Sequence, residues 1–145
     1  IRKEIKSFIA KAKERDLMPC IRLNGTSDIS WENTGLIEEF KLIQWYDYTK
    51  VYNRALSYVN GKLPSNYYLL YSLNEDNKKQ AFDILKKGGN ISAVFRKKLP
   101  NMYKGFKVIN ADLHDLRFLD IKNTIAGLVA KGKAKKDYSG FVLDS

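Results

Sequence analysis

The stretch YYLLYSLNEDNKKQAFDILKKGGNISAVF, residues 67–95, decides the fold. Residues 67–72 are mostly aromatic and aliphatic, which is typical of a β-strand. Asn74 is the expected N-cap of the helix that follows, and two lysines and two glycines at 86–89 mark its end. A second apolar run at 91–95 predicts another strand. Strand, helix and strand in this order form the βα unit of a parallel sheet.

The same alternation continues along the chain. The further elements that the sequence predicts are helices at 2–16, 30–40 and 52–59 and strands at 20–23, 42–48, 106–109 and 125–130. The first four strands recur at intervals of roughly 23–25 residues, which leaves room for one helix between successive strands. We therefore predict a single α/β domain over residues 1–145, built from repeated βα units with a mainly parallel sheet.

Composition restricts the class of protein. Of the 145 residues, 44% are hydrophobic and 29% charged, as in globular rather than disordered proteins. No apolar run approaches the roughly 18–20 residues that a membrane-spanning helix needs, so we expect no membrane partner. Residues Ile1 to Glu4 do not resemble a signal peptide, and the single cysteine, Cys20, excludes an internal disulfide. These features favour a reducing, cytoplasmic setting.

The positive charge is strong and unevenly distributed. The net charge is +10 and the isoelectric point is near 9.6, a balance that favours a polyanionic partner such as nucleic acid. Residues 84–111 contain seven basic and no acidic side chains, and residues 121–136 contain five basic and no acidic ones. A surface charged only for solubility, which is the alternative, would intersperse the two signs.

Polar residues follow each predicted strand. Ligands of parallel α/β folds bind beyond the carboxyl ends of the strands. The candidate ligand-binding residues there are Asn24, Asp28, Tyr48, Ser72, Arg96, Lys97, Lys98, Arg117, Lys131 and Lys133. We expect Asn24, Asp28, Tyr48 and Ser72 to surround one concavity together with His114. The alternative is that these polar side chains only form turns and caps, and no known phosphate-loop motif is present.

The segment NADLHDLRFLD, residues 110–120, offers the only catalytic candidates. Asp112, His114 and Asp115 could supply an acid–base pair or hard metal ligands. A lone histidine does not define a zinc site, and Arg117 could instead form a structural pair with a carboxylate. The metal and any other cofactor therefore stay unknown at this point.

Five segments together resemble a family of bacteriophage and mobile-element proteins that is loosely related to the phage gene product 88 proteins. They are RLNGTSDISWE (22–32), WYDYTK (45–50), YYLLYSLNEDN (67–77), YKGFKVINADLHDLRFLD (103–120) and GLVAKGKAKKDYSGFV (127–142). The resemblance implies a phage-encoded protein in the host-cell cytoplasm but no particular activity. It also implies a (β/α) barrel of which this chain is the later portion.

A closed barrel of this kind takes about 250 residues, so the 145 residues here predict a partial one. Longer members of the family look like cysteine-bearing proteins with a cysteine-rich segment upstream. Whether a metal ion or an iron–sulfur cluster is bound is left open by this resemblance, and Cys20 alone supplies no such site.

Three functions are compatible with these observations. The first is a basic protein that binds a polyanion, most simply nucleic acid, at the strand ends. Arg96, Lys97, Lys98, Lys131 and Lys133 would then contact phosphates. Tyrosines that could stack on bases, or else pack in the core, are Tyr48, Tyr52, Tyr67, Tyr68, Tyr71 and Tyr103. The second function is an enzyme that uses the same strand ends, and the third is an inhibitor of an acidic host protein.

Overall fold

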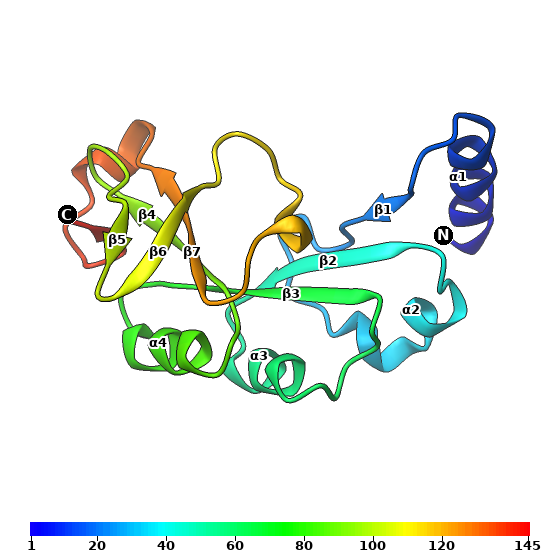
Figure 1. The fold of residues 1–145 in the computed structure, drawn as a ribbon, viewed down its shortest axis with the longest axis horizontal. Coiled ribbons are helices and arrows are strands. Elements are labelled where there is room, and N and C mark those ends of the chain that lie inside the picture. The colour runs from blue at the N-terminus through cyan, green and yellow to red at the C-terminus, as the bar shows by residue number, and fades with distance from the viewer.

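The computed structural model describes all residues from 1 to 145 and confirms the α/β class (Figure 1). Its single sheet contains β1 (Cys20–Ile21), β2 (Gln44–Thr49), β3 (Tyr67–Ser72), β4 (Ile91–Phe95), β5 (Met102–Tyr103), β6 (Phe106–Asn110), β7 (Thr124–Val129) and β8 (Val142–Leu143). The strand order is β1-β2-β3-β4-β7-β6-β5, and β8 pairs with β4. All pairs are parallel except β5 with β6. The sheet is open, with β1 and β5 at its edges, as a partial barrel requires.

The connections cover the two faces of the sheet differently. From β1 to β4 the sheet grows in one direction, and right-handed connections place α2 (Leu36–Glu39), α3 (Tyr52–Val59) and α4 (Lys78–Lys86) on one face. β7 then enters between β4 and β6, so the connection 111–123 runs back in the opposite direction. The same handedness places this connection on the other face, as the arch on the side away from α3 and α4 in Figure 1. Its 3₁₀ turn, η2 (Arg117–Leu119), lies against β3.

Two apolar clusters hold these layers together. The larger cluster packs Ile84 and Leu85 of α4 against Tyr71, Ile91 and Phe95 of the sheet. The smaller cluster joins α2 and the N-terminal helix α1 (Arg2–Glu14) to β2 and β3. No helix of the structure combines the length and the apolar character needed to cross a membrane.

The structure corrects three of the predicted elements. The helix expected at 30–40 is divided into the 3₁₀ helix η1 (Trp31–Thr34) and α2, because Gly35 adopts a left-handed conformation with φ of 75°. Asn74 does not cap α4, which begins four residues later. Its side chain instead accepts the N–H of Asp76 at 2.9 Å, in a turn that delays the helix. The first strand ends at Ile21 rather than at residue 23.

The alternation of strand and helix does not predict β5. Lys104 and Gly105 connect β5 to β6 with φ angles of 47° and 85°. Two consecutive positive φ angles are the signature of a tight antiparallel hairpin whose twist suits the strands. Local turn chemistry therefore adds this strand at the edge of the sheet.

Gly127 of β7 provides a test of the close packing around the sheet. A Cβ atom there would lie 2.7 Å from Val108 Cγ1 and 2.8 Å from Leu99 Cδ2. We expect Gly127→Ala to lower the free energy of unfolding by about 1–3 kcal/mol through overpacking. Gly25→Ala is the matched control, since a Cβ there meets nothing within 4 Å, and it should change stability by less than about 1 kcal/mol. Equal effects in urea titrations of the two variants would contradict this packing.

Candidate functional site

A cleft of about 220 Å³ lies at the carboxyl ends of β1, β2 and β3, and we call it the rim cleft. Asn24, Asp28, Tyr48 and Ser72 all line it, so the structure brings these four predicted residues together. The other lining residues include the cations Arg22 and Lys50 and the hydroxyl groups of Thr26 and Ser27. Nearly all of the lining residues are polar or charged, so a ligand there would be held by hydrogen bonds and charge.

Asn24 organises the loop that forms one wall of the rim cleft. It is buried, and its amide nitrogen donates to Asp47 Oδ2 at 3.1 Å while its backbone N–H donates to Asp47 Oδ1 at 3.0 Å. Its side-chain oxygen accepts bonds from Ser27, from the backbone of Ile29 and from the indole of Trp31, all within 3.1 Å. The side chain of Asn24 is thus occupied inside the protein, and its role at the cleft is to hold the loop.

Arg54 of α3 holds the same loop from below. Its side chain is 7% exposed and donates two hydrogen bonds to the carboxylate of Glu32, of 2.8 and 2.9 Å. It also pairs with Asp28 Oδ1 and donates to the Tyr67 hydroxyl at 2.9 Å, and that hydroxyl donates to Asp47. Burial raises the pKa of Asp47, although the hydrogen bonds that it accepts oppose the shift.

The loop is therefore fixed by bonds within the protein, and some of them join residues that line the cleft. The second oxygen of Asp28 accepts bonds from the Thr49 hydroxyl and the Lys50 N–H, at 2.9 and 2.8 Å. The backbone N–H groups of residues 25–28, by contrast, donate no hydrogen bond within the protein. These N–H groups remain available to an anion beside Arg22 and Lys50.

The connection 111–123 borders the rim cleft through Asp115. This carboxylate accepts a bond of 2.7 Å from the Tyr48 hydroxyl and lies 3.3 Å from Arg22 Nη1. The Arg22 guanidinium also stacks on the Tyr48 ring, 4.4 Å from its centroid. Burial and the bond to Asp115 raise the pKa of Tyr48, so its hydroxyl stays a hydrogen-bond donor at neutral pH.

The three catalytic candidates do not converge on one point. Asp112 accepts the Val129 N–H at 3.0 Å and pairs with Lys131 at 2.9 Å, and these bonds lower its pKa. Neither Asp115 nor His114 lines the rim cleft, although Asp115 is bonded to Tyr48 and Arg22, which do. The side chain of His114 instead accepts the Leu116 N–H at 3.1 Å. No three His, Cys, Asp or Glu side chains of the chain gather as metal ligands would.

Arg117 is buried rather than placed at the rim. It donates to the backbone oxygen of His114 at 2.7 Å and lies 3.4 Å from Asp120 Oδ2. This position fits the ion-pair alternative to ligand binding, with Asp120 as the partner.

Several lysines of the basic blocks gather at the ends of β4 and β7, whereas Lys87 and Lys122 lie elsewhere. Lys97 and Lys98 follow β4, and η3 (Gly132–Lys136) follows β7. We use the name basic edge for Lys97, Lys98, Lys133, Lys135 and Lys136, which are all exposed and form no ion pair. Lys131 adjoins them but is paired with Asp112.

Arg96 holds the basic edge together, but its own guanidinium is engaged in bonds within the protein. Its side chain is 13% exposed and forms an ion pair with Asp144. It donates to the backbone oxygens of Lys135 and Asp137 at 3.0 and 2.9 Å, and it lies 4.2 Å from the centre of the Tyr138 ring. Arg96 therefore ties the end of β4 to the segment that carries the lysines.

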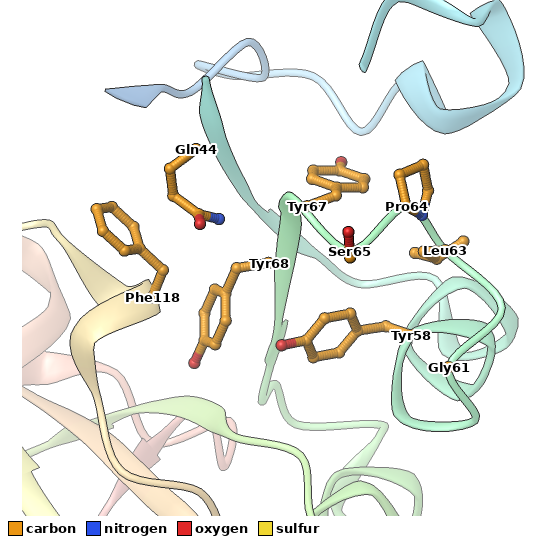
Figure 2. Close-up of a pocket in the computed structure, with 9 residues that line it drawn as sticks. All are labelled: Gln44, Tyr58, Gly61, Leu63, Pro64, Ser65, Tyr67, Tyr68 and Phe118. Atoms are coloured by element: carbon orange, nitrogen blue, oxygen red, sulfur yellow. The ribbon is translucent and has the colours of Figure 1, made fainter. Parts of the chain in front are cut away.

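A further groove lies at the amino ends of the strands, where the strand-end rule does not predict a site; Figure 2 shows part of it. Tyr58 of α3, Tyr68 of β3 and Phe118 of η2 line it, and of these only Tyr68 is a sequence-level candidate for stacking. The groove depends on the crossing of residues 111–123 over the sheet, which no local pattern in the sequence indicates.

The chain matches a known protein family. A family model described as Gene product 88 matches residues 1–145. No curated protein and no solved structure matches the chain.

The Arg54 network predicts a large effect of one substitution. Arg54→Met leaves the carboxylates of Glu32 and Asp28 without their cation, and Glu32 is only 6% exposed. We expect a loss of about 3–5 kcal/mol in the free energy of unfolding. Arg2→Met breaks the exposed pair with Glu39 and should cost less than about 1 kcal/mol. Similar losses for the two variants in chemical denaturation would refute the network.

The lowered pKa of Asp112 predicts that the stability of the protein depends on pH. Because its folded-state pKa is lowered, its contribution to stability is complete above the unfolded-state value of about 4 and is lost as the pH falls through the folded-state pKa. Asp112→Asn should therefore reduce stability by about 1 kcal/mol at neutral pH and have little effect near pH 2. Thermal unfolding from pH 2 to 7 measures this, with the exposed, unpaired Glu14→Gln as the charge control. A difference that stays constant with pH would refute the assignment.

Proposed function

Because the chain belongs to the family of phage gene product 88, whose description names no activity, we propose a function from its geometry: the protein binds nucleic acid through phosphate contacts at the basic edge. The observation that carries this proposal is the gathering of five exposed lysines that form no ion pair. Phosphates at regular spacing are the partner that such an array suits, since each lysine releases condensed counterions on contact.

The charge of the whole chain supports this choice of surface. Residues 84–145 contain thirteen basic and five acidic side chains, which is +8 of the total net charge of +10. The excess charge is therefore concentrated in the half of the molecule that contains the basic edge. A positive field confined to one region steers a polyanion to it.

The rim cleft supports a single binding surface along the carboxyl ends of the strands. The last pair between β3 and β4 is Ser72↔Ser92, and Ser72 lines the rim cleft. β4 continues to Phe95 and leads into Lys97 and Lys98 of the basic edge. A strand held at the basic edge could place its next phosphate against the free N–H groups of residues 25–28 and the side chains of Arg22 and Lys50.

Binding fits the geometry better than catalysis does. Asp112 is occupied by Val129 and Lys131, and Asp115 by Tyr48 and Arg22. Both carboxylates are thus engaged in bonds within the protein, which supports binding over acid–base catalysis.

A salt titration tests the proposal. The slope of log affinity against log salt concentration is about −0.9 per phosphate contact on duplex DNA and −0.7 on single strands. Changing the five lysines of the basic edge to Gln should flatten the slope on duplex DNA by about 4 if all five make contacts. The control variant changes five other exposed, unpaired lysines to Gln, namely Lys3, Lys6, Lys11, Lys13 and Lys41.

The control variant has the same net charge as the test variant but should keep most of the slope. Equal losses of slope in the two variants would show that only the net charge of the protein determines binding. Undetectable binding to duplex DNA, single-stranded DNA and RNA at about 50 mM salt would reject the proposal and favour an acidic protein as the partner.

A further inference from the structure

A groove with aromatic walls crosses the amino ends of β2, β3 and β4, whereas the basic edge lies at the carboxyl ends of the strands. Figure 2 shows the lobe of this groove that lies at β2 and β3. The groove has two lobes of about 400 and 380 Å³, and Tyr58, Gly61, Tyr68 and Phe118 line both. We call it the aromatic groove. Each lobe lies in the size range of small-molecule sites, which is about 300–1,000 Å³.

The walls of the aromatic groove come from three different elements. Tyr68 of β3 stands between Tyr58 of α3 and Phe118 of η2 in Figure 2. The rings of Tyr58 and Tyr68 meet edge to face, with centroids 5.6 Å apart. Phe118 is fixed by the ring of Tyr46, whose centroid is 5.4 Å away. The groove is thus preorganised for a flat, aromatic ligand.

Asp120 contributes a hydrogen-bond acceptor without a donor. It lines the second lobe, and its side chain is 8% exposed. Its buried Oδ2 atom faces Arg117 Nη1 at 3.4 Å, and neither atom makes a hydrogen bond. Its Oδ1 atom accepts no hydrogen bond either but is not fully buried, so an N–H donor is expected at Oδ1 when the groove is occupied.

Two lysines stand at the same lobe. Lys122 lines it and has no carboxylate partner, whereas Lys87 pairs with Asp83 on α4. A phosphate attached to a ligand in the groove would find Lys122 free to neutralise it.

We propose that the aromatic groove binds an unpaired nucleobase that carries an exocyclic amino group. The base lies against the rings of Tyr58 and Tyr68, its amino group donates to Asp120 Oδ1, and its phosphate approaches Lys122. Cytosine, adenine and guanine each carry such an amino group. Uracil has none, and its N3–H donor is flanked by two carbonyl oxygens, which the carboxylate repels. This site does not depend on the basic edge, and it accepts either a free nucleotide or an unpaired base of a strand.

Calorimetric titration of the full chain with CMP and UMP tests the site, with ribose 5-phosphate as the control for phosphate alone. We expect CMP to bind saturably, and about tenfold more tightly than UMP, because one amino group donates to the carboxylate. Asp120→Asn should remove this preference, since an amide both donates and accepts hydrogen bonds.

A matched pair of variants isolates the stacking. Tyr58→Leu should weaken CMP binding about tenfold, because it removes a ring against which the base lies. Tyr58→Phe should bind as the original protein does, since it keeps the ring. Burial is the only cause of the raised pKa of the Tyr58 hydroxyl, so this hydroxyl has no hydrogen bond that the substitution would break. Thermal unfolding of both variants verifies that they are folded.

Oligonucleotides distinguish the two sources of the base. If the ligand is a free nucleotide, CMP binds and Tyr58→Leu leaves the affinity for a cytosine oligonucleotide unchanged. If the ligand is a base within a strand, Tyr58→Leu weakens the binding of the oligonucleotide as well. The five-lysine variant of the basic edge should leave CMP binding intact in both cases, so the two sites fail separately.

Two results would overturn the site. One is CMP binding no tighter than that of ribose 5-phosphate, with no effect of Tyr58→Leu on an oligonucleotide. The other is an Asp120→Asn variant that keeps the full preference for CMP, which would mean that an ordered water satisfies Asp120.

Discussion

The pairing of β7 with β4 is the constraint on which the rest of the structure depends. Five residue pairs, from Ile91↔Ile125 to Phe95↔Val129, hold the two strands parallel in the middle of the sheet. One consequence is that η3 with its lysines emerges beside the end of β4, which creates the basic edge. The other is that the connection 111–123 must return across the face opposite α3 and α4. That crossing carries Asp115 to the rim cleft and Phe118 to the aromatic groove.

Arginines and lysines have different roles in this molecule. Arg54 and Arg96 act as internal ties, each holding three or more groups through the planar fork of the guanidinium. The exposed lysines of the basic edge make no ion pair and keep their charge for a ligand. The division follows from chemistry, because a guanidinium suits fixed, multidentate bonds and an ammonium group on a flexible stem suits adjustable phosphate contacts.

The sequence was informative wherever a feature depends on local pattern. The parallel strands and α3 follow from apolar periodicity, and the meeting of Asn24 with Tyr48 at one cleft follows from the strand-end rule. Two kinds of feature were not predictable. The break at Gly35 depends on a backbone conformation that the apolar pattern does not record. The aromatic groove, and the internal role of Arg96, depend on contacts between segments far apart in the chain.

If the ends of β4 and β7 form the surface that binds nucleic acid, a ¹H–¹⁵N correlation titration with a short duplex at moderate salt will map the contact residue by residue. The first and largest chemical-shift changes should occur at residues 96–98 and 131–136, with little change in α1 despite its own exposed lysines. Shifts centred on α1, or spread evenly over all exposed lysines, would contradict this assignment.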